Sequence, residues 1–230
     1  MEVLAVIPCR SGSKGLPDKN IKLLNGRPMM DYAIRPALEA SMIDKVIVST
    51  DTEEYARTAR SLGADVPFLR PPYLAEDVPT EDVLIHAVEW MERKQNYAPS
   101  VVVCLQCTTP FLTKTDVDQL VRAVEPYGGF DSSATVCEVS EYPEWMYTVN
   151  QDGSLRNIMG LQVKGSRGVR QALPRRYRLN GAGYAVRRDT LMFEKTLVGR
   201  RCYGVMMPRE RSVDIDTELD FKICEMLKKC

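Results

Sequence analysis

Histidine is almost missing from this sequence, which has only His86 among its 230 residues. A hydrolase built on serine, histidine and aspartate needs a histidine beside its nucleophile, and no Gly-x-Ser-x-Gly motif is present either. His86 lies beside the apolar stripe of a predicted helix, where a structural role is the simpler interpretation. The sequence therefore argues against a serine hydrolase.

Long apolar runs and an excess of charge are also missing. The longest apolar runs, Val3–Ile7 and Val101–Leu105, are far shorter than the about 20 residues that a membrane-spanning helix needs. Lysine plus arginine number 31, and so do aspartate plus glutamate, so the net charge is zero. Non-specific nucleic-acid binders usually carry a basic excess. We therefore expect neither a membrane nor a nucleic acid as a partner.

The seven cysteines do not form a disulfide framework, because they are odd in number and spread over a mid-sized chain. Cys104 and Cys107 form an isolated Cys-x-x-Cys pair. No second pair lies at zinc spacing and Cys104 sits in an apolar run, so packing explains them better than zinc or redox chemistry. The N-terminal residues have no basic leader and no long apolar segment, which predicts no signal peptide. We expect a reducing, cytoplasmic location.

Short β-like runs alternate with amphipathic helical windows along the chain. The predicted strands are Val3–Pro8, Lys45–Ser49, Val66–Leu69, Val101–Gln106, Ser132–Val139, Gly183–Val186 and Tyr203–Met207. The predicted helices are Met29–Ala40, Glu53–Leu62, one that Thr80 caps, one that Thr115 caps, and Thr217–Lys229. Pro36 predicts a kink or a late start in the first helix. This alternation predicts an α/β fold with a mostly parallel sheet, helices on both faces, and ligands at the carboxyl ends of the strands.

The length fits a single domain over residues 1–230. Within it, Tyr142–Leu179 is polar, rich in arginine and hard to place in the main core. Its four arginines between Arg170 and Arg178 suit recognition of an anion such as a carboxylate, which arginine binds through two parallel hydrogen bonds. A solvated loop explains this segment equally well.

A glycine-rich loop follows the first strand and carries three cations. Gly12 and Gly15 let the backbone approach a ligand closely, and successive amides can form an anion nest. Arg10, Lys14 and Lys19 surround this turn at the carboxyl end of a strand, which suits a polyphosphate. The spacing matches neither the P-loop nor the dinucleotide fingerprint. A basic surface loop is the alternative, and composition alone does not decide between them.

Asp214 and Asp216 lie two residues apart near the C-terminus, so on an extended segment both carboxylates point the same way. A pair of hard oxygen ligands suits Mg²⁺, which takes substrate phosphate oxygens as further ligands. Asp216 can also simply cap the final helix. Asp214 has no such structural role, which favours a metal site.

Two further side chains stand at strand ends. The Gln106 amide can bind a base edge or a sugar hydroxyl, or can merely close the end of its strand. Arg70 follows the predicted strand Val66–Leu69 and can contact an anion or a base. For Arg70, a surface arginine held by the neighbouring prolines is the simpler interpretation of the residues alone.

Taken in order, these segments resemble the motifs of the acylneuraminate cytidylyltransferases, which are the CMP-sialic acid synthetases and their bacterial nonulosonate relatives. No single motif is decisive, but the ordered set is specific and spans nearly the whole chain. The motifs are Pro8–Asn20, Val48–Asp51, Arg70–Asp77, Leu105–Pro110, Asn180–Tyr184 and Asp214–Thr217.

The resemblance implies a Rossmann-like α/β domain, a homodimer, and a dimerisation arm that reaches into the partner's site. Residues 142–179 are the candidate for that arm. It also implies that CTP reacts with a nine-carbon 2-keto sugar acid to give a CMP-sugar and pyrophosphate. The alternatives are a CMP-KDO-type synthetase, a cytidylyltransferase for another small acid, or a non-catalytic nucleotide- or sugar-binding protein of the same fold.

The resemblance assigns roles by position. For CTP it implies Arg10, Ser13, Lys14, Gly15, Lys19, Asn20, Arg70 and Thr80. For the sugar acid it implies Gln106, Arg170, Asn180 and Tyr184. Asp214 and Asp216 hold Mg²⁺, and together with Arg10 and Lys19 they form the expected catalytic set. These roles suit phosphoryl transfer, which depends on positioning and charge neutralisation.

Overall fold

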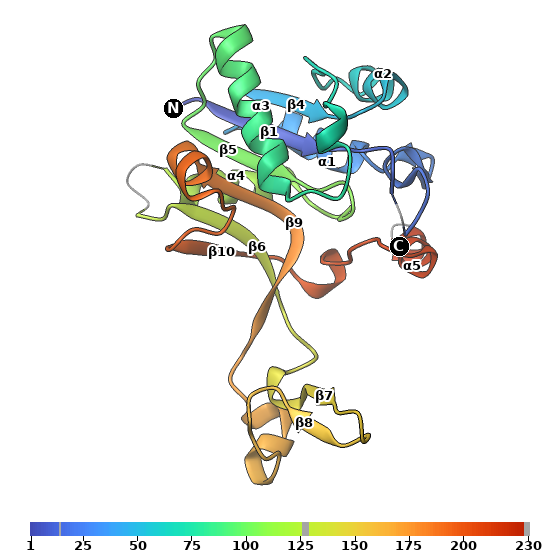
Figure 1. The fold of residues 1–230 in the computed structure, drawn as a ribbon, viewed down its shortest axis with the longest axis vertical. Helices are drawn as coiled ribbons and strands as arrows, with labels where there is room; N and C mark the ends of the chain where they lie inside the picture. Colours follow the sequence, from blue (N-terminus) through green and yellow to red (C-terminus); the bar gives the residue numbers. More distant parts are fainter. Residues whose placement is uncertain (14, 126–128, 228–230) are drawn as a thin grey trace. The chain divides into compact units, whose positions relative to one another are not determined.

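The computed structural model describes residues 1–13, 15–125 and 129–227. Its main feature is a six-stranded sheet with the order β10-β6-β9-β5-β1-β4 (Figure 1). The strands are β1 (Val3–Pro8), β4 (Lys45–Ser49), β5 (Val101–Leu105), β6 (Ser132–Glu138), β9 (Tyr177–Arg187) and β10 (Cys202–Met206). Strand β1 pairs in parallel with both β4 and β5, and β6 pairs in parallel with β10, whereas β9 runs antiparallel to β5. The predicted mostly parallel α/β sheet is confirmed.

Helices cover both faces of this sheet because its central strands are apolar on both sides. In β1, Val3, Ala5 and Ile7 pack in one buried cluster, and Leu4 and Val6 pack in another. The first cluster contains side chains of α1, α2 and α4, and the second contains those of α3. The helices are α1 (Asp31–Glu39), α2 (Glu53–Ser61), α3 (Thr80–Gln95), α4 (Lys114–Ala123) and α5 (Glu218–Leu227).

Several elements differ from the prediction in where they begin or in whether they form. Helix α1 begins at Asp31, two residues later than predicted, and continues through Pro36, so Pro36 does not mark its start and the predicted kink stays a prediction. The predicted strand Val66–Leu69 is wrong, because only isolated bridges form there, from Asp65 to Ile47 and from Leu69 to Thr50. Pro67 lies between these bridges and has no amide hydrogen for a strand ladder.

Two predicted helix caps are also wrong. Thr113, and not Thr115, caps α4: its hydroxyl accepts from the Asp116 amide, and the Asp116 carboxylate accepts from the Thr113 amide. This reciprocal pair is a capping box, which needs an acidic residue three positions after the cap. Thr80 is the first residue of α3, and Pro79, whose ring fixes φ, precedes it as the N-cap residue. The final helix is described from Glu218 to Leu227, and Lys228 and Lys229 of the predicted helix lie outside the described residues.

The chain forms two compact units. The larger contains Met1–Val136 and Leu179–Cys230, and the smaller contains Cys137–Arg178. The chain leaves the larger unit along β6 and returns along β9. In the smaller unit, the hairpin of β7 (Tyr147–Val149) and β8 (Leu155–Asn157) is antiparallel. The single domain and the dimerisation role of residues 142–179 stay predictions.

Short elements complete the described structure. A two-stranded ribbon of β2 (Leu23–Leu24) and β3 (Arg27–Pro28) follows a 3-10 turn, η1 (Lys19–Ile21). A second turn, η7 (Arg209–Arg211), precedes residues 214–216, called the acidic segment from here on. Every helix within the described ranges is too short or too polar to span a membrane.

Candidate active site

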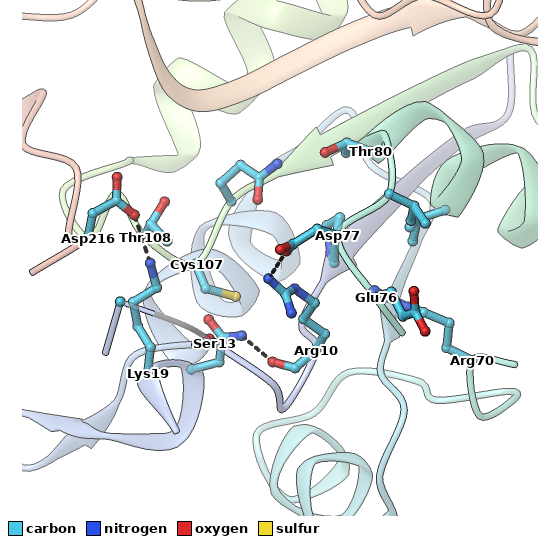
Figure 2. A pocket seen from close by; sticks show the side chains of 16 residues that line it. Arg10, Ser13, Lys19, Arg70, Glu76, Asp77, Thr80, Cys107, Thr108 and Asp216 are labelled. Carbon is cyan, nitrogen blue, oxygen red and sulfur yellow. Dashed lines mark hydrogen bonds and ion pairs between the residues drawn. The ribbon is translucent and has the colours of Figure 1, made fainter. Parts of the chain in front are cut away.

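A cavity of about 320 Å³ lies where β1 and β5 end (Figure 2). It brings together every described residue predicted to bind CTP: Arg10, Ser13, Gly15, Lys19, Asn20, Arg70 and Thr80. Gln106 and Asp216 also line it. Lys14 lies outside the described residues. The cavity thus lies at the carboxyl ends of two parallel strands that are distant in the chain, as expected for an α/β sheet, and other parts of the chain add Arg70, Thr80 and Asp216.

Lys19 connects the glycine-rich loop to the C-terminal acidic segment. Its ammonium nitrogen lies 3.0 Å from a carboxylate oxygen of Asp216 and 2.7 Å from the Ile215 carbonyl oxygen. The Lys19 side chain is nearly buried, whereas that of Asp216 is 73% exposed. The cationic loop and the acidic segment therefore share one cavity, which is the arrangement that a triphosphate and its counter-ion require.

Gly15 allows the two backbones to approach this closely. A Cβ atom at Gly15 would lie only 2.6 Å from the carbonyl oxygen of Asp216, closer than real Cβ contacts. Position 15 therefore requires glycine for close approach between two chain segments.

Arg10 is held by both its backbone and its side chain. Its guanidinium forms an ion pair with Asp77, and the Asn20 amide donates to the Arg10 carbonyl oxygen at 2.9 Å. Asp51 accepts from the amide and the hydroxyl of Ser11, at 2.8 and 2.7 Å. Asp51 and Asp77 were present in the sequence motifs, but their roles depend on contacts between distant segments that no motif spacing reveals.

Arg70 supplies the third cation, and the surface interpretation of it is wrong. The residue is only 5% exposed. Its guanidinium donates to the hydroxyl and carbonyl oxygens of Ser49 and to the carbonyl oxygen of Leu74. Burial lowers the pKa of Arg70, yet an arginine keeps its charge at neutral pH. A fixed positive charge therefore lies in the cavity wall.

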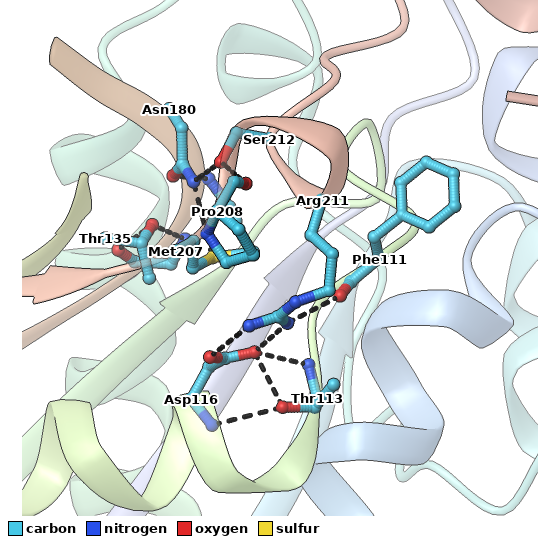
Figure 3. A network of polar contacts seen from close by, with 11 residues as sticks. Phe111, Thr113, Asp116, Thr135, Asn180, Met207, Pro208, Arg211 and Ser212 are labelled. Carbon is cyan, nitrogen blue, oxygen red and sulfur yellow. Dashed lines mark hydrogen bonds and ion pairs between the residues drawn. The ribbon is translucent and has the colours of Figure 1, made fainter. Parts of the chain in front are cut away.

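A polar network holds Arg211 and Ser212, which lie shortly before the acidic segment, against other parts of the larger unit (Figure 3). Arg211 donates to both carboxylate oxygens of Asp116, at 2.6 and 3.1 Å, and also to the carbonyl oxygen of Phe111. One residue further along, the Ser212 hydroxyl accepts from the Asn180 amide at 2.8 Å. These contacts attach the turn before Asp214 to the start of α4 and to β9.

Asp116 is the centre of that network. It is 4% exposed and accepts from Thr113 as well as from Arg211. Burial raises the pKa of Asp116, but the hydrogen bonds from Arg211 and Thr113 outweigh it, so the pKa lies below its ordinary value. The carboxylate is therefore held in its charged form by the fold.

Three predicted site residues are not part of the described cavity lining. Asn180 is 1% exposed, and its amide is engaged with Ser212. Tyr184 lies on β9 opposite Cys104, where burial raises the pKa of Tyr184 and the charge of Asp214 contributes to this shift. Asp214 lies beside Gly181, where an added Cβ would be 3.7 Å from a carboxylate oxygen. The described cavity lining contains none of the three, so their ligand roles stay predictions.

Arg170 belongs to the smaller unit. It lies in the short turn η5 (Arg170–Ala172), with its guanidinium 5.9 Å from the ring centre of Tyr142. In the same unit Arg176 forms an ion pair with buried Glu144 at 2.9 Å. The role of Arg170 in sugar binding stays a prediction.

The carboxylate at the cavity is the type of ligand that magnesium prefers. No group of three or more metal-ligating side chains occurs in the described part of the chain. Magnesium does not require one, because it is usually held by one or two carboxylates together with phosphate oxygens and water. The exposed Asp216 carboxylate on the cavity wall is such a ligand.

The fold and the cavity indicate an α/β protein that binds a polyanion at its strand ends. The family model described as cytidylyltransferase matches residues 4–151, and the chain belongs to this family. A solved structure shares the fold. A CMP:2-keto-3-deoxy-manno-octonic acid synthetase complexed with CTP superimposes with a TM-score of 0.71 at 19% identity, over 100% of this chain and 99% of that one.

Alignments with curated relatives cover almost all of the chain. The N-acylneuraminate cytidylyltransferase of Streptococcus agalactiae serotype V is 34% identical over 96% of this chain, which spans only 52% of that protein. The CMP-N,N'-diacetyllegionaminic acid synthase of Legionella pneumophila is 31% identical, over 99% of this chain and 96% of that one. The pseudaminic acid cytidylyltransferase of Campylobacter jejuni is 29% identical, over 100% and 97%.

Proposed function

We propose that this protein transfers CMP from CTP to the anomeric hydroxyl of a nonulosonic, sialic-type acid and releases pyrophosphate. The observation that carries the proposal is the meeting of Arg10, Lys19 and Arg70 with Asp216 in one cavity of a cytidylyltransferase-family chain. Arg10 and Lys19 from the glycine-rich loop and Arg70 from a separate segment place three cations at this cavity, which suits a triphosphate. The N-acylneuraminate, legionaminic acid and pseudaminic acid relatives supply the class of acceptor.

The chain's own residues bring about the reaction by positioning and charge neutralisation. Arg10 and Lys19 bind phosphate oxygens, for which Arg10 exchanges its present partner Asp77. Arg70, fixed by Ser49 and Leu74, faces the nucleotide without needing to reorder. The acceptor hydroxyl attacks the α-phosphorus in line with the departing pyrophosphate, a step that needs little covalent help from the protein. Gln106 is on the cavity wall to bind a hydroxyl of the acceptor.

Asp216, assisted by Asp214, would hold Mg²⁺ in this scheme. When bound, the ion neutralises charge on the phosphate oxygens. Lys19 holds the Asp216 carboxylate at the cavity wall and so orients it.

The test is pyrophosphate release from CTP and Mg²⁺ with a panel of N-acylneuraminates, legionaminate, pseudaminate and KDO. We expect turnover with one nonulosonic acid. Turnover with KDO alone would favour the CMP-KDO-type alternative, and silence across the panel would contradict the proposal. Stabilisation by CTP without turnover would indicate a non-catalytic nucleotide-binding protein.

A matched pair of lysine variants tests the site itself. Lys19→Met should raise the KM for CTP or lower kcat by about tenfold or more, because it removes a charge-assisted contact. Lys22→Met is the control, since Lys22 is paired with Glu218 at 3.0 Å and is no part of the described cavity wall. Equal CTP dependence in the two variants would exclude a role for Lys19 in nucleotide binding.

We propose that the protein is a homodimer whose contact is made by the smaller unit. Residues of that unit expose large apolar side chains: Met146, Tyr147, Val149, Leu155, Ile158, Met159 and Val169. Such a set is costly to leave in water. Light scattering should give twice the chain mass, and Val149→Asp combined with Leu155→Asp should reduce it to one chain. A single-chain mass for the unaltered protein would refute the dimer.

A cytoplasmic location is the last part of the proposal. Six cysteines, all those among the described residues, form no disulfide. Free thiols persist in a reducing compartment.

A further inference from the structure

Two buried thiols meet at the cavity wall. Cys9 follows β1 and Cys107 follows β5, and these strands are parallel neighbours in which Val6 lies opposite Cys104. Continuing that register by three residues places Cys9 opposite Cys107. The two sulfur atoms are 3.6 Å apart.

The geometry selects this pair over the Cys-x-x-Cys motif. Side chains alternate between faces along a strand, so Cys104 and Cys107, three residues apart, point to opposite faces. Accordingly, Cys9 and Cys107 belong to one buried cluster and Cys104 belongs to the other. Adjacent parallel strands lie about 4.8 Å apart, within the range of Cα separations, roughly 4.4–6.8 Å, that disulfides span.

The cavity gives a small oxidant access to one member of the pair. Cys107 is among the lining residues and is 2% exposed, whereas Cys9 is completely buried behind it. Burial and the contact with Cys107 raise the pKa of the Cys9 thiol. Cys107 is therefore the thiol that an oxidant meets first, and a nucleotide in the cavity would cover it.

We infer that Cys9 and Cys107 form a reversible disulfide when the protein meets a hydroperoxide, and that this disulfide shuts down the nucleotide site. The effect on activity rests on the proposed function, whereas the disulfide does not. In the first step the Cys107 sulfur attacks a peroxide oxygen, the O–O bond breaks, and water leaves. In the second, the Cys9 sulfur displaces the oxygen from the Cys107 sulfenic acid as a second water. Two thiols and one hydrogen peroxide thus become one disulfide and two waters.

The Cys9–Cys107 disulfide would deform the site because the neighbours of both cysteines in the chain line the cavity. The sulfur atoms must approach from 3.6 Å to about 2.05 Å, so the Cys9 and Cys107 side chains turn toward each other and the segments that follow β1 and β5 must adjust. Cys9 directly precedes Arg10, and Cys107 stands between Gln106 and Thr108. Arg10, Gln106 and Thr108 all line the cavity. A displacement near 1 Å at reacting groups costs roughly a hundredfold in rate.

The experiment treats the full chain with hydrogen peroxide, alkylates the remaining thiols, and maps peptides by mass spectrometry. We expect a Cys9–Cys107 cross-linked peptide, a fall in CTP turnover of about tenfold or more, and recovery of both with dithiothreitol. Prior addition of CTP should slow cross-linking. Cys9→Ala should keep its basal activity and resist inactivation, whereas Cys104→Ala, altered on the opposite face of β5, should respond as the unaltered chain does.

The outcomes separate this inference from the proposed function. If no acceptor supports turnover, peptide mapping and the CTP-induced rise in Tm still report the disulfide and its effect on the site. Absence of the Cys9–Cys107 peptide after complete peroxide treatment would overturn the inference. Equal inactivation of Cys9→Ala and the unaltered chain would also overturn it, because the loss would then arise elsewhere.

Discussion

Replacing Gly15 with alanine tests the close approach of the glycine-rich loop to the acidic segment. The added Cβ would meet the Asp216 carbonyl oxygen at 2.6 Å, and that atom is backbone, which cannot rotate away. The two segments must separate by roughly 0.5 Å or more, and overpacking of this kind typically costs about 1–3 kcal/mol. The same movement stretches the contact between Lys19 and Asp216, now 3.0 Å.

We therefore expect Gly15→Ala to lower CTP turnover by about tenfold to a hundredfold, since positioning errors below 1 Å already slow such reactions. The Tm should fall as well, by roughly 2–4 °C for each kcal/mol in a chain of this size. Pyrophosphate release and thermal unfolding measure the two effects.

Gly12→Ala is the matched control in the same loop. Among the described atoms, its Cβ would lie near the Arg10 guanidinium alone, at an ordinary 3.5 Å, and Gly12, unlike Gly15, is not part of the described cavity lining. Gly12→Ala should therefore keep most of its activity and stability. If Gly15→Ala behaves like Gly12→Ala in both assays, the loop does not depend on contact with the acidic segment and the reasoning is refuted.

Further predictions concern the acidic segment and its anchor. Asp214→Asn should largely abolish Mg²⁺-dependent turnover with little change in Tm, and normal turnover would show that Asp214 is no metal ligand. Asp116→Asn should lower the free energy of unfolding by about 2 kcal/mol, measured in urea, because it removes the charge from a buried network. Because the pKa of Asp116 is depressed in the folded protein, its stabilisation is present above about pH 4 and is lost as the pH falls through the folded pKa. Acid unfolding curves should therefore differ less between Asp116→Asn and the unaltered chain as the pH falls below 4, and a constant difference would contradict this.

Strands with a strong apolar pattern were predictable from the sequence. The ranges Val3–Pro8 and Lys45–Ser49 match the structure, because burial on both faces leaves a short, nearly continuous apolar run. The Thr113 cap could also have been predicted from the sequence, since the Thr-x-x-Asp spacing is typical of a capping box. The direction and the 11-residue length of β9 could not be predicted, because strand pairing depends on topology and leaves little trace in local composition.

The candidate site was predictable where motifs follow strands and unpredictable where contacts join distant segments. Parallel strands end at one edge, so Arg10 and Gln106 had to meet near it. By contrast, the pairing of Arg10 with Asp77 and the burial of Arg70 depend on how the connection after β4 folds back. The sulfur pair of Cys9 and Cys107 was hidden for the same reason: 98 residues separate its members.

The place of β9 in the sheet constrains how the chain acquires its structure during synthesis. Once residue 105 has left the ribosome, β4, β1 and β5 can already pair. The other edge of β5 must then wait for residues 183–187, since β9 alone joins it to β6 and β10. An apolar strand with one unsatisfied edge invites association with other chains. Nascent chains stalled between these points are therefore the species most in need of a chaperone.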